Sequence, residues 1–263
     1  MTQGQSARDG TALSVAAISD RGAVRRTNED RALALQGRNG DASTEWALLA
    51  VADGVGGAPA GELASTIAID TIAEASDELS AADPRQLLLR LFHSANQRIC
   101  DASLRNPERR GMACTLVVAV VRDNKLWLAN AGDSRAYLGR AESLLQLTMD
   151  HSLVADGSLA PELRRMAAER PAARHVVTRS LGSPTGVTPD IQGPIGLELG
   201  DRLLLCSDGL YNILTTEELR DGLEDDVDAA ARTLVARANK RGAPDNVTAV
   251  VLRVATAEPG LER

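Results

Sequence analysis

Aromatic side chains are scarce in this sequence of 263 residues, at 2% of the total. Proteins that bind single-stranded nucleic acid stack the bases on aromatic rings, so this composition argues against such a role. The formal net charge of −7 points the same way, because a phosphate backbone attracts basic proteins. We therefore expect no nucleic-acid partner, and a core built from aliphatic residues, since 44% of the chain is apolar.

Cysteine is also rare. The chain has three cysteines, Cys100, Cys114 and Cys206, which are widely spaced and have apolar neighbours. An odd number in such surroundings indicates buried thiols in a reducing compartment rather than disulfides. The longest apolar stretch, 113–121, is about half as long as a membrane-spanning helix. The first dozen residues lack the basic and apolar regions of a secretory signal. We expect a cytoplasmic protein with no membrane partner.

The length and apolar content are typical of one domain with a large core. We expect a flexible leader at 1–10, a single domain at 11–256 and a flexible tail at 257–263. Alternation and apolar runs predict strands at 12–19, 31–36, 46–52, 114–122, 125–131, 135–138, 201–207 and 247–254. The three strands between 114 and 138 are separated by hairpin residues, which predicts an antiparallel meander.

Helical spacing of apolar residues predicts two helix pairs, one from 59 to about 99 and one at 216–223 and 227–240. Strands, two helices, strands, two helices and a last strand form the order expected when two sheets stack face to face. We therefore predict an α+β fold, a four-layer α-β-β-α sandwich with two central, mainly antiparallel β-sheets flanked by helix pairs.

The segment at about 151–190 has no periodic pattern apart from a short helix at 161–169. A loop of this length in a compact domain is usually functional, so we interpret it as a flap. Its dense arginines form either a solvated face or a surface that attracts a phosphorylated acidic partner. His151 and His175 border or lie in the flap, where a structural role is the default and substrate contact is the alternative.

Aspartate recurs in turns beside apolar runs in five separate parts of the chain. Asp-Gly alone is ordinary turn chemistry. Acidic residues at several strand ends of one domain instead suggest a convergent site of oxygen ligands for a metal ion. The sequence therefore predicts a metalloenzyme. The turns are Asn28-Glu29-Asp30, Ala52-Asp53-Gly54, Gly132-Asp133-Ser134-Arg135, Ser207-Asp208-Gly209 and Asp245-Asn246.

The wording and order of these turns, together with Arg25 in the first, resemble the metal-dependent serine/threonine protein phosphatases of type 2C, bacterial branch. The resemblance runs from about Ser14 to Val254. It implies hydrolysis of phosphoserine and phosphothreonine by attack of a hydroxide that bridges two Mn²⁺ or Mg²⁺ ions. It also implies phosphorylated proteins as substrates and a bacterial serine/threonine kinase as the opposing enzyme. We expect a monomer.

The resemblance assigns a role to each matching residue. Asp53, the Gly54 carbonyl, Asp208 and Asp245 are implied metal ligands, and Asp133 is the implied ligand of a third, weaker metal. The implied catalytic residues are Arg25, which clamps the substrate phosphate, and Glu29 and Asp30, which hold metal-bound water.

One position departs from part of the family. Animal members carry a histidine, proposed as the general acid, where this chain has Val55, whereas bacterial members commonly have an apolar residue there. The donor of the proton to the leaving group is therefore unidentified, and a metal-bound water is the candidate. The alternative function is a catalytically silent module of the same fold that binds phosphoproteins. A regulatory subunit of a larger apparatus, such as a kinase-controlled secretion system, is compatible with activity.

Overall fold

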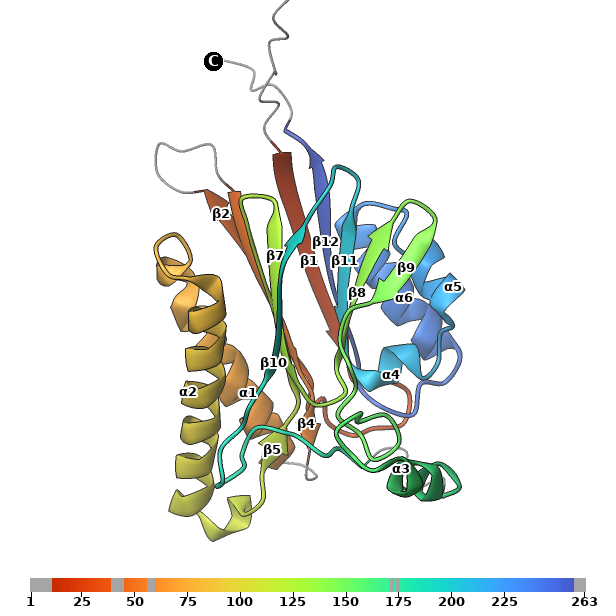
Figure 1. The fold of residues 1–263 in the computed structure, drawn as a ribbon. Helices are drawn as coiled ribbons and strands as arrows, with labels where there is room; N and C mark the ends of the chain where they lie inside the picture. Colours follow the sequence, from red (N-terminus) through yellow and green to blue (C-terminus); the bar gives the residue numbers. More distant parts are fainter. Residues whose placement is uncertain (1–10, 39–44, 56–59, 171–172, 174–175, 258–263) are drawn as a thin grey trace, which may run out of the picture.

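The computed structural model describes residues 11–38, 45–55, 60–170, 173 and 176–257. Two five-stranded antiparallel sheets stack face to face, and helices cover both outer sides (Figure 1). One sheet has the order β1-β12-β11-β8-β9 and the other has the order β10-β7-β6-β3-β2. A short ribbon, β4-β5, is separate from both. The prediction of a four-layer α+β sandwich is confirmed.

The strands of the described chain are β1 (Thr11–Asp20), β2 (Arg31–Arg38), β3 (Glu45–Ala52), β4 (Gly54–Val55), β5 (Ala113–Cys114), β6 (Leu116–Arg122), β7 (Lys125–Ala131), β8 (Arg135–Arg140), β9 (Ser143–Gln146), β10 (Asp190–Gly196), β11 (Arg202–Cys206) and β12 (Val247–Thr256). The helices are α1 (Ala60–Ala73), α2 (Pro84–Arg105), α3 (Pro161–Ala168), α4 (Asp208–Tyr211), α5 (Thr216–Asp221) and α6 (Val227–Lys240), with 3-10 turns η1 (Glu74–Glu78) and η2 (Pro107–Arg109).

Strand β3 shows why the central strands are apolar throughout. Successive side chains of a strand point to opposite faces of its sheet. Leu48, Ala50 and Ala52 pack with the buried residues of α1 and α2. Leu49 and Val51 alternate with them and pack against the second sheet. Strand β12 is buried in the same way, between that inner layer and α6. Three apolar clusters therefore fill the three spaces between four layers.

Several details of the strands differ from the prediction, which included neither β4 nor β9 and joined β6 to part of β5. The expected meander stops after β7, because β8 pairs with β11 of the other sheet. The link at Gly132, where φ is +118°, carries the chain across the sandwich. Strand β10 was not predicted, since it contains Gly193 and Pro194. It is an edge strand that pairs only with β7 in the described chain, with an irregular register between Gln192 and Ile195.

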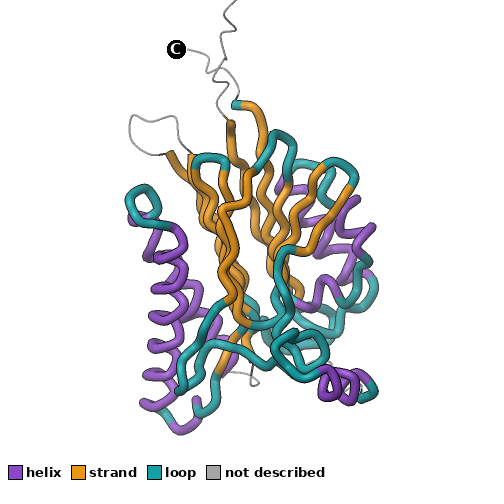
Figure 2. The backbone as a smooth tube through the Cα atoms, viewed as in Figure 1, coloured by secondary structure: helices purple, strands orange, loops and turns teal. Residues whose placement is uncertain are grey.

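The expected leader at 1–10 and all but the first residue of the expected tail at 257–263 lie outside the described residues. Among the helices of the described ranges, none is both long enough and apolar enough to cross a bilayer. In its described residues, the segment between β9 and β10 contains α3 and two isolated bridges and otherwise consists of turns and loops. Figure 2 shows these loops gathered beneath one end of the two sheets, which is also where β3, β7 and β11 end.

Candidate active site

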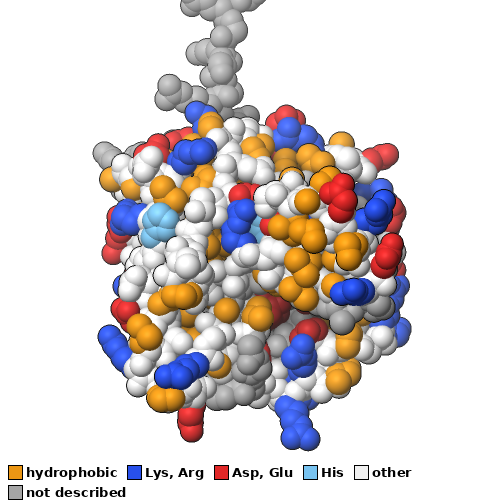
Figure 3. All heavy atoms as spheres, turned by 60° about the horizontal axis from the view of Figure 1, so that its bottom comes forward, with side chains coloured by type: hydrophobic (Ala, Val, Ile, Leu, Met, Phe, Trp, Pro, Cys, Tyr) orange, Lys and Arg blue, Asp and Glu red, His pale blue; other side chains and the backbone are white. Residues whose placement is uncertain are grey.

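The five aspartate-containing turns named above meet at the same end of the sandwich. A cavity of about 770 Å³ lies there. Five separate segments supply its acidic lining. Antiparallel pairing brings the ends of β3 and β11 beside the starts of β2 and β12. Figure 3 looks onto this face, where acidic side chains lie in a hollow bordered by hydrophobic ones. The predicted site residues that line the cavity are Arg25, Glu29, Asp53, Gly54, Asp133, Asp208 and Asp245.

Asp53 is at the electrostatic centre of this group. Its desolvation raises the pKa of its carboxyl well above the ordinary range, and the charges of Asp30, Asp208, Asp133 and Asp245 raise it further. Burial likewise raises the pKa of Asp133 to about 7, with Asp208 as the next cause. Carboxylates crowded in this way repel one another, so the site favours a bound cation that neutralises them.

Asp30 is buried behind the cavity wall and is not among its lining residues. The hydroxyls of Ser207 and Thr248 both donate to its Oδ2 at 2.6 Å. Its Oδ1 is buried and accepts no hydrogen bond within the described part of the chain. Burial raises the pKa of Asp30 to about 7, although the two hydroxyl donors act in the opposite direction. A buried acceptor without a donor is costly, so this oxygen is suited to a water molecule of the site.

Arg25 lies at the lip of the cavity, with its side chain about half exposed. Its Nη2 donates to Asp245 Oδ2 at 2.6 Å. Arg25, the predicted phosphate clamp, and Asp245, a predicted metal ligand, therefore form an ion pair with each other. Glu29 faces the same cavity, and burial raises the pKa of its carboxyl.

Two further residues hold the loops of the site and had no predicted role. The Thr115 hydroxyl accepts the main-chain N–H of Asp53 at 3.2 Å, and the Thr115 N–H donates to the Asp53 carbonyl at 2.8 Å. The Asn246 side chain accepts the Glu29 N–H at 2.9 Å and donates to two carbonyls of the β1–β2 loop. Asn246 belongs to a recognised turn, whereas Thr115 is hidden in an apolar run.

Within the described residues, no three His, Cys, Asp or Glu side chains converge closely enough to form a ready metal cage. The carboxylates surround the cavity rather than closing on one point. Their mutual repulsion and the pairing of Asp245 with Arg25 are consistent with that spacing.

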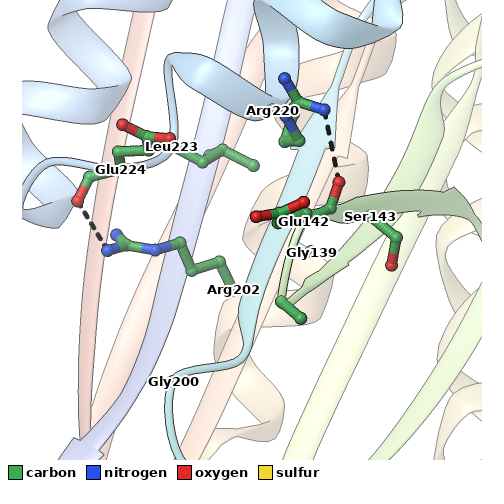
Figure 4. A pocket seen from close by; sticks show the side chains of 9 residues that line it. Gly139, Glu142, Ser143, Gly200, Arg202, Arg220, Leu223 and Glu224 are labelled. Atoms are coloured by element: carbon green, nitrogen blue, oxygen red, sulfur yellow. Dashed lines mark hydrogen bonds between the residues drawn. The ribbon is translucent and has the colours of Figure 1, made fainter.

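A smaller cavity, of about 380 Å³, is lined by the β8–β9 turn, the start of β11 and the end of α5. Figure 4 shows Arg202 donating to the Glu224 carbonyl and Arg220 donating to the Glu142 carbonyl. This cavity shares no lining residue with the acidic one. Since both guanidinium groups already bond main-chain oxygens, they hold turns together there.

A family model described as protein phosphatase 2C matches residues 16–247 of this chain. The chain belongs to the protein phosphatase 2C family. The curated serine/threonine protein phosphatase PstP of Mycobacterium tuberculosis is 35% identical over 253 residues, which are 94% of this chain and 46% of PstP. The chain thus spans less than half the length of that relative. Protein phosphatase PhpP of Streptococcus pneumoniae is 34% identical over 245 residues, 91% of this chain and 97% of PhpP.

Solved structures of family members have the same fold. The catalytic domain of PstP in complex with two manganese ions has a TM-score of 0.78 at 35% identity, over 93% of this chain and 99% of that one. PppA of Pseudomonas aeruginosa, described as a key regulatory component of T6SS, has a TM-score of 0.74 at 33% identity. That match covers 92% of this chain and 97% of PppA.

The donor set of this phosphatase 2C chain fits hard divalent ions. Mn²⁺ and Mg²⁺ prefer carboxylate, carbonyl and water oxygens, and the acidic cavity offers the first two classes. A carboxylate cluster suited to cations should have raised pKa values and unused oxygen acceptors when the cations are absent. The pKa of Asp53 is raised, and Oδ1 of Asp30 accepts no hydrogen bond in the described residues.

Proposed function

We propose that residues 11–256 form a metal-dependent protein serine/threonine phosphatase domain. The observation that supports this most is the meeting of Asp53, Asp208, Asp245 and Asp133 around one cavity with Arg25 at its lip. Family membership and the manganese complex of PstP support it further. Two bound Mn²⁺ or Mg²⁺ ions, with a third held more weakly, would activate water and offset phosphate charge.

Each predicted residue has a position suited to its proposed role. Asp53, Asp208, Asp245 and the Gly54 carbonyl hold the two ions, and Asp133 holds the third. The unbonded Oδ1 of Asp30 accepts a hydrogen bond from a water molecule of the site, and Glu29 does so from the cavity wall.

Arg25 exchanges Asp245 for the substrate phosphate, because its planar guanidinium can donate to two phosphate oxygens at once. Val55 lines the same cavity and has no proton to give, so another group must protonate the leaving oxygen.

The substrates we propose are phosphoserine and phosphothreonine proteins of the cytoplasm, including targets of an opposing kinase, with the enzyme acting as a monomer. The flap would select among them, because Val176, Val177 and Ser180 line the acidic cavity. Ser152, Val154 and Ala168 line a neighbouring cavity of about 540 Å³ that shares Asp133 and Asn212 with the first. Exchanging 155–173 should reduce turnover of a phosphoprotein more than turnover of a small aryl phosphate. Equal losses would contradict the role of the flap.

The test of activity is hydrolysis of p-nitrophenyl phosphate and a phosphothreonine peptide with and without Mn²⁺. Asp208→Ala should abolish turnover, and Asp70→Ala, an exposed change on α1, should not. No turnover by folded wild type in any metal would favour the silent phosphoprotein-binding module instead. The likeness to PppA makes a regulatory role in a larger apparatus compatible with activity, and capture of partner proteins by Asp208→Ala would test it.

A further inference from the structure

His151 is a buried histidine outside the acidic cavity, with 1% of its surface exposed. It stands at the start of the flap, yet its main contact is with the β7–β8 loop. The Gly132 N–H donates to Nδ1 of His151 at 3.0 Å. In return, the His151 N–H donates to the Gly132 carbonyl at 3.0 Å. Two hydrogen bonds from one residue thus hold the peptide groups that immediately precede Asp133.

These contacts fix the proton on the imidazole. A main-chain N–H can only donate, so Nδ1 of His151 carries no proton, and the neutral ring is protonated at Nε2. Nε2 lies 3.0 Å from Asp190 Oδ2, to which it donates. The other oxygen of Asp190 accepts from Arg179 at 2.5 Å. The ring therefore connects Gly132 to two residues at the far end of the flap.

The opposite side of the β7–β8 loop is also held. A Cβ at Gly132 would overlap the side chain of Thr115, so the loop lies directly against that residue. The Thr115 hydroxyl is 2.7 Å from the Ser134 hydroxyl and also accepts the Asp53 N–H. Asp133 thus lies between two fixed neighbours. Thr115 connects the β7–β8 loop to Asp53, and His151 connects the β7–β8 loop to the flap.

The main chain of the flap is tied to the same histidine. The Thr178 N–H donates to the His151 carbonyl at 2.7 Å, and Ser152 pairs with Val177 as an isolated antiparallel bridge. The first and the later segments of the flap therefore meet at His151. A change in this part of the flap would reach Asp133 through the buried His151 side chain. Leu181 joins the flap to Cys114, beside Thr115, by a separate bridge.

We propose that His151 is a positioning residue that holds the Asp133 carboxylate at the cavity and couples it to the base of the flap. It does not touch the reacting atoms. The metal-binding part of this proposal rests on the proposed function, whereas the tautomer and the link to the flap stand without it.

Two substitutions at His151 separate its contacts. In His151→Asn, the amide oxygen replaces Nδ1 as acceptor for Gly132, while the contact to Asp190 is lost. His151→Phe keeps a ring and loses both bonds. Leaving the buried Gly132 N–H without an acceptor costs free energy, which the loop relieves by moving Asp133 out of its binding position. Restoring that position on binding weakens the affinity about tenfold. We therefore expect His151→Phe to weaken Mn²⁺ binding at the Asp133 site about tenfold by calorimetry, and His151→Asn to recover most of it. His93→Phe, an exposed change on α2, is the matched control.

A double-mutant cycle identifies the route of the effect. If His151 acts through Asp133, the combined variant His151→Phe/Asp133→Ala should bind Mn²⁺ like Asp133→Ala alone. Fully additive losses would overturn the positioning role. Mn²⁺ binding unchanged in Asp133→Ala would contradict the metal role of Asp133 and, with it, this part of the proposal.

Two readouts need neither metal nor activity. The chain has three histidines, so nitrogen NMR of histidine-labelled, metal-free protein is simple, and His151→Asn identifies its signal. We expect an unprotonated Nδ1 and a protonated Nε2 at neutral pH, and faster tryptic cleavage of the flap in His151→Phe. The opposite tautomer, or unchanged cleavage, would overturn the proposal. Failure of turnover with these two results intact would instead count against the proposed function.

Discussion

Replacing Asp133 by asparagine should stabilise the metal-free protein. Burial raises the pKa of Asp133 from its ordinary 3.8 to about 7, a difference of about 3 pH units, which corresponds to about 4 kcal/mol. Solvent penetration and relaxation reduce this figure, so we expect a gain of about 2 kcal/mol at pH 8. For a chain of this size, the melting temperature should rise by about 4–8 °C. The Tyr211 hydroxyl donates to the main-chain carbonyl of Asp133, so the change leaves that hydrogen bond in place.

The pH dependence has a definite sign. A carboxyl with a raised folded-state pKa stabilises the fold fully below about pH 4, and that stability is lost as the pH rises through about 7. The advantage of Asp133→Asn should therefore shrink to under about half at pH 5. With saturating Mn²⁺ the wild type should melt at a higher temperature than Asp133→Asn, because a ligand that binds the folded state stabilises the protein that binds it more tightly.

Calorimetry in EDTA at pH 8 and pH 5, then with Mn²⁺, checks all three expectations. Asp70→Asn, an exposed change on α1, controls for the loss of one negative charge. A melting temperature for Asp133→Asn at or below that of the wild type in EDTA at pH 8 would refute the argument.

Three further predictions concern the loops of the site. Gly209→Ala would force a Cβ into the Asn246 carbonyl and should lower the free energy of unfolding by about 2 kcal/mol or more in thermal scans. Gly196→Ala, where a Cβ would meet open space, should change that free energy little. Arg25→Ala should raise the KM for a phosphopeptide about tenfold, and Arg25→Lys should recover only part of that; an unchanged KM would argue against the phosphate clamp. Asn246→Ala removes the acceptor of the Glu29 N–H and should cost about 2 kcal/mol in urea unfolding, and a neutral result would mean that water replaces it.

The layers of the fold could be predicted because apolar runs such as β6 are buried on both faces and leave little ambiguity. Strand β10 could not, since glycine and proline are tolerated only where an edge position and an irregular register accommodate them. The crossing of β8 to the other sheet was equally hidden, because Gly132 and Asp133 are also ordinary hairpin residues.

The positions of the acidic residues could be predicted because turn motifs mark the ends of strands. Their partners could not. The pairing of Arg25 with Asp245 joins residues from opposite ends of the sequence, and the bond from Gly132 to His151 depends on how the flap returns to the sheet. Such contacts arise from tertiary register, which no local pattern records.

The scarcity of aromatic residues has an optical consequence. The chain has two tryptophans, and both Trp46 and Trp127 pack in the cluster between one sheet and the helices α1 and α2. The two tyrosines, Tyr137 and Tyr211, belong to the cluster under α6 instead. Tryptophan fluorescence will therefore follow the unfolding of one half of the molecule, while far-ultraviolet circular dichroism follows both. Coincidence of the two transitions would show that the halves of the sandwich unfold together, and separation would reveal which half is lost first.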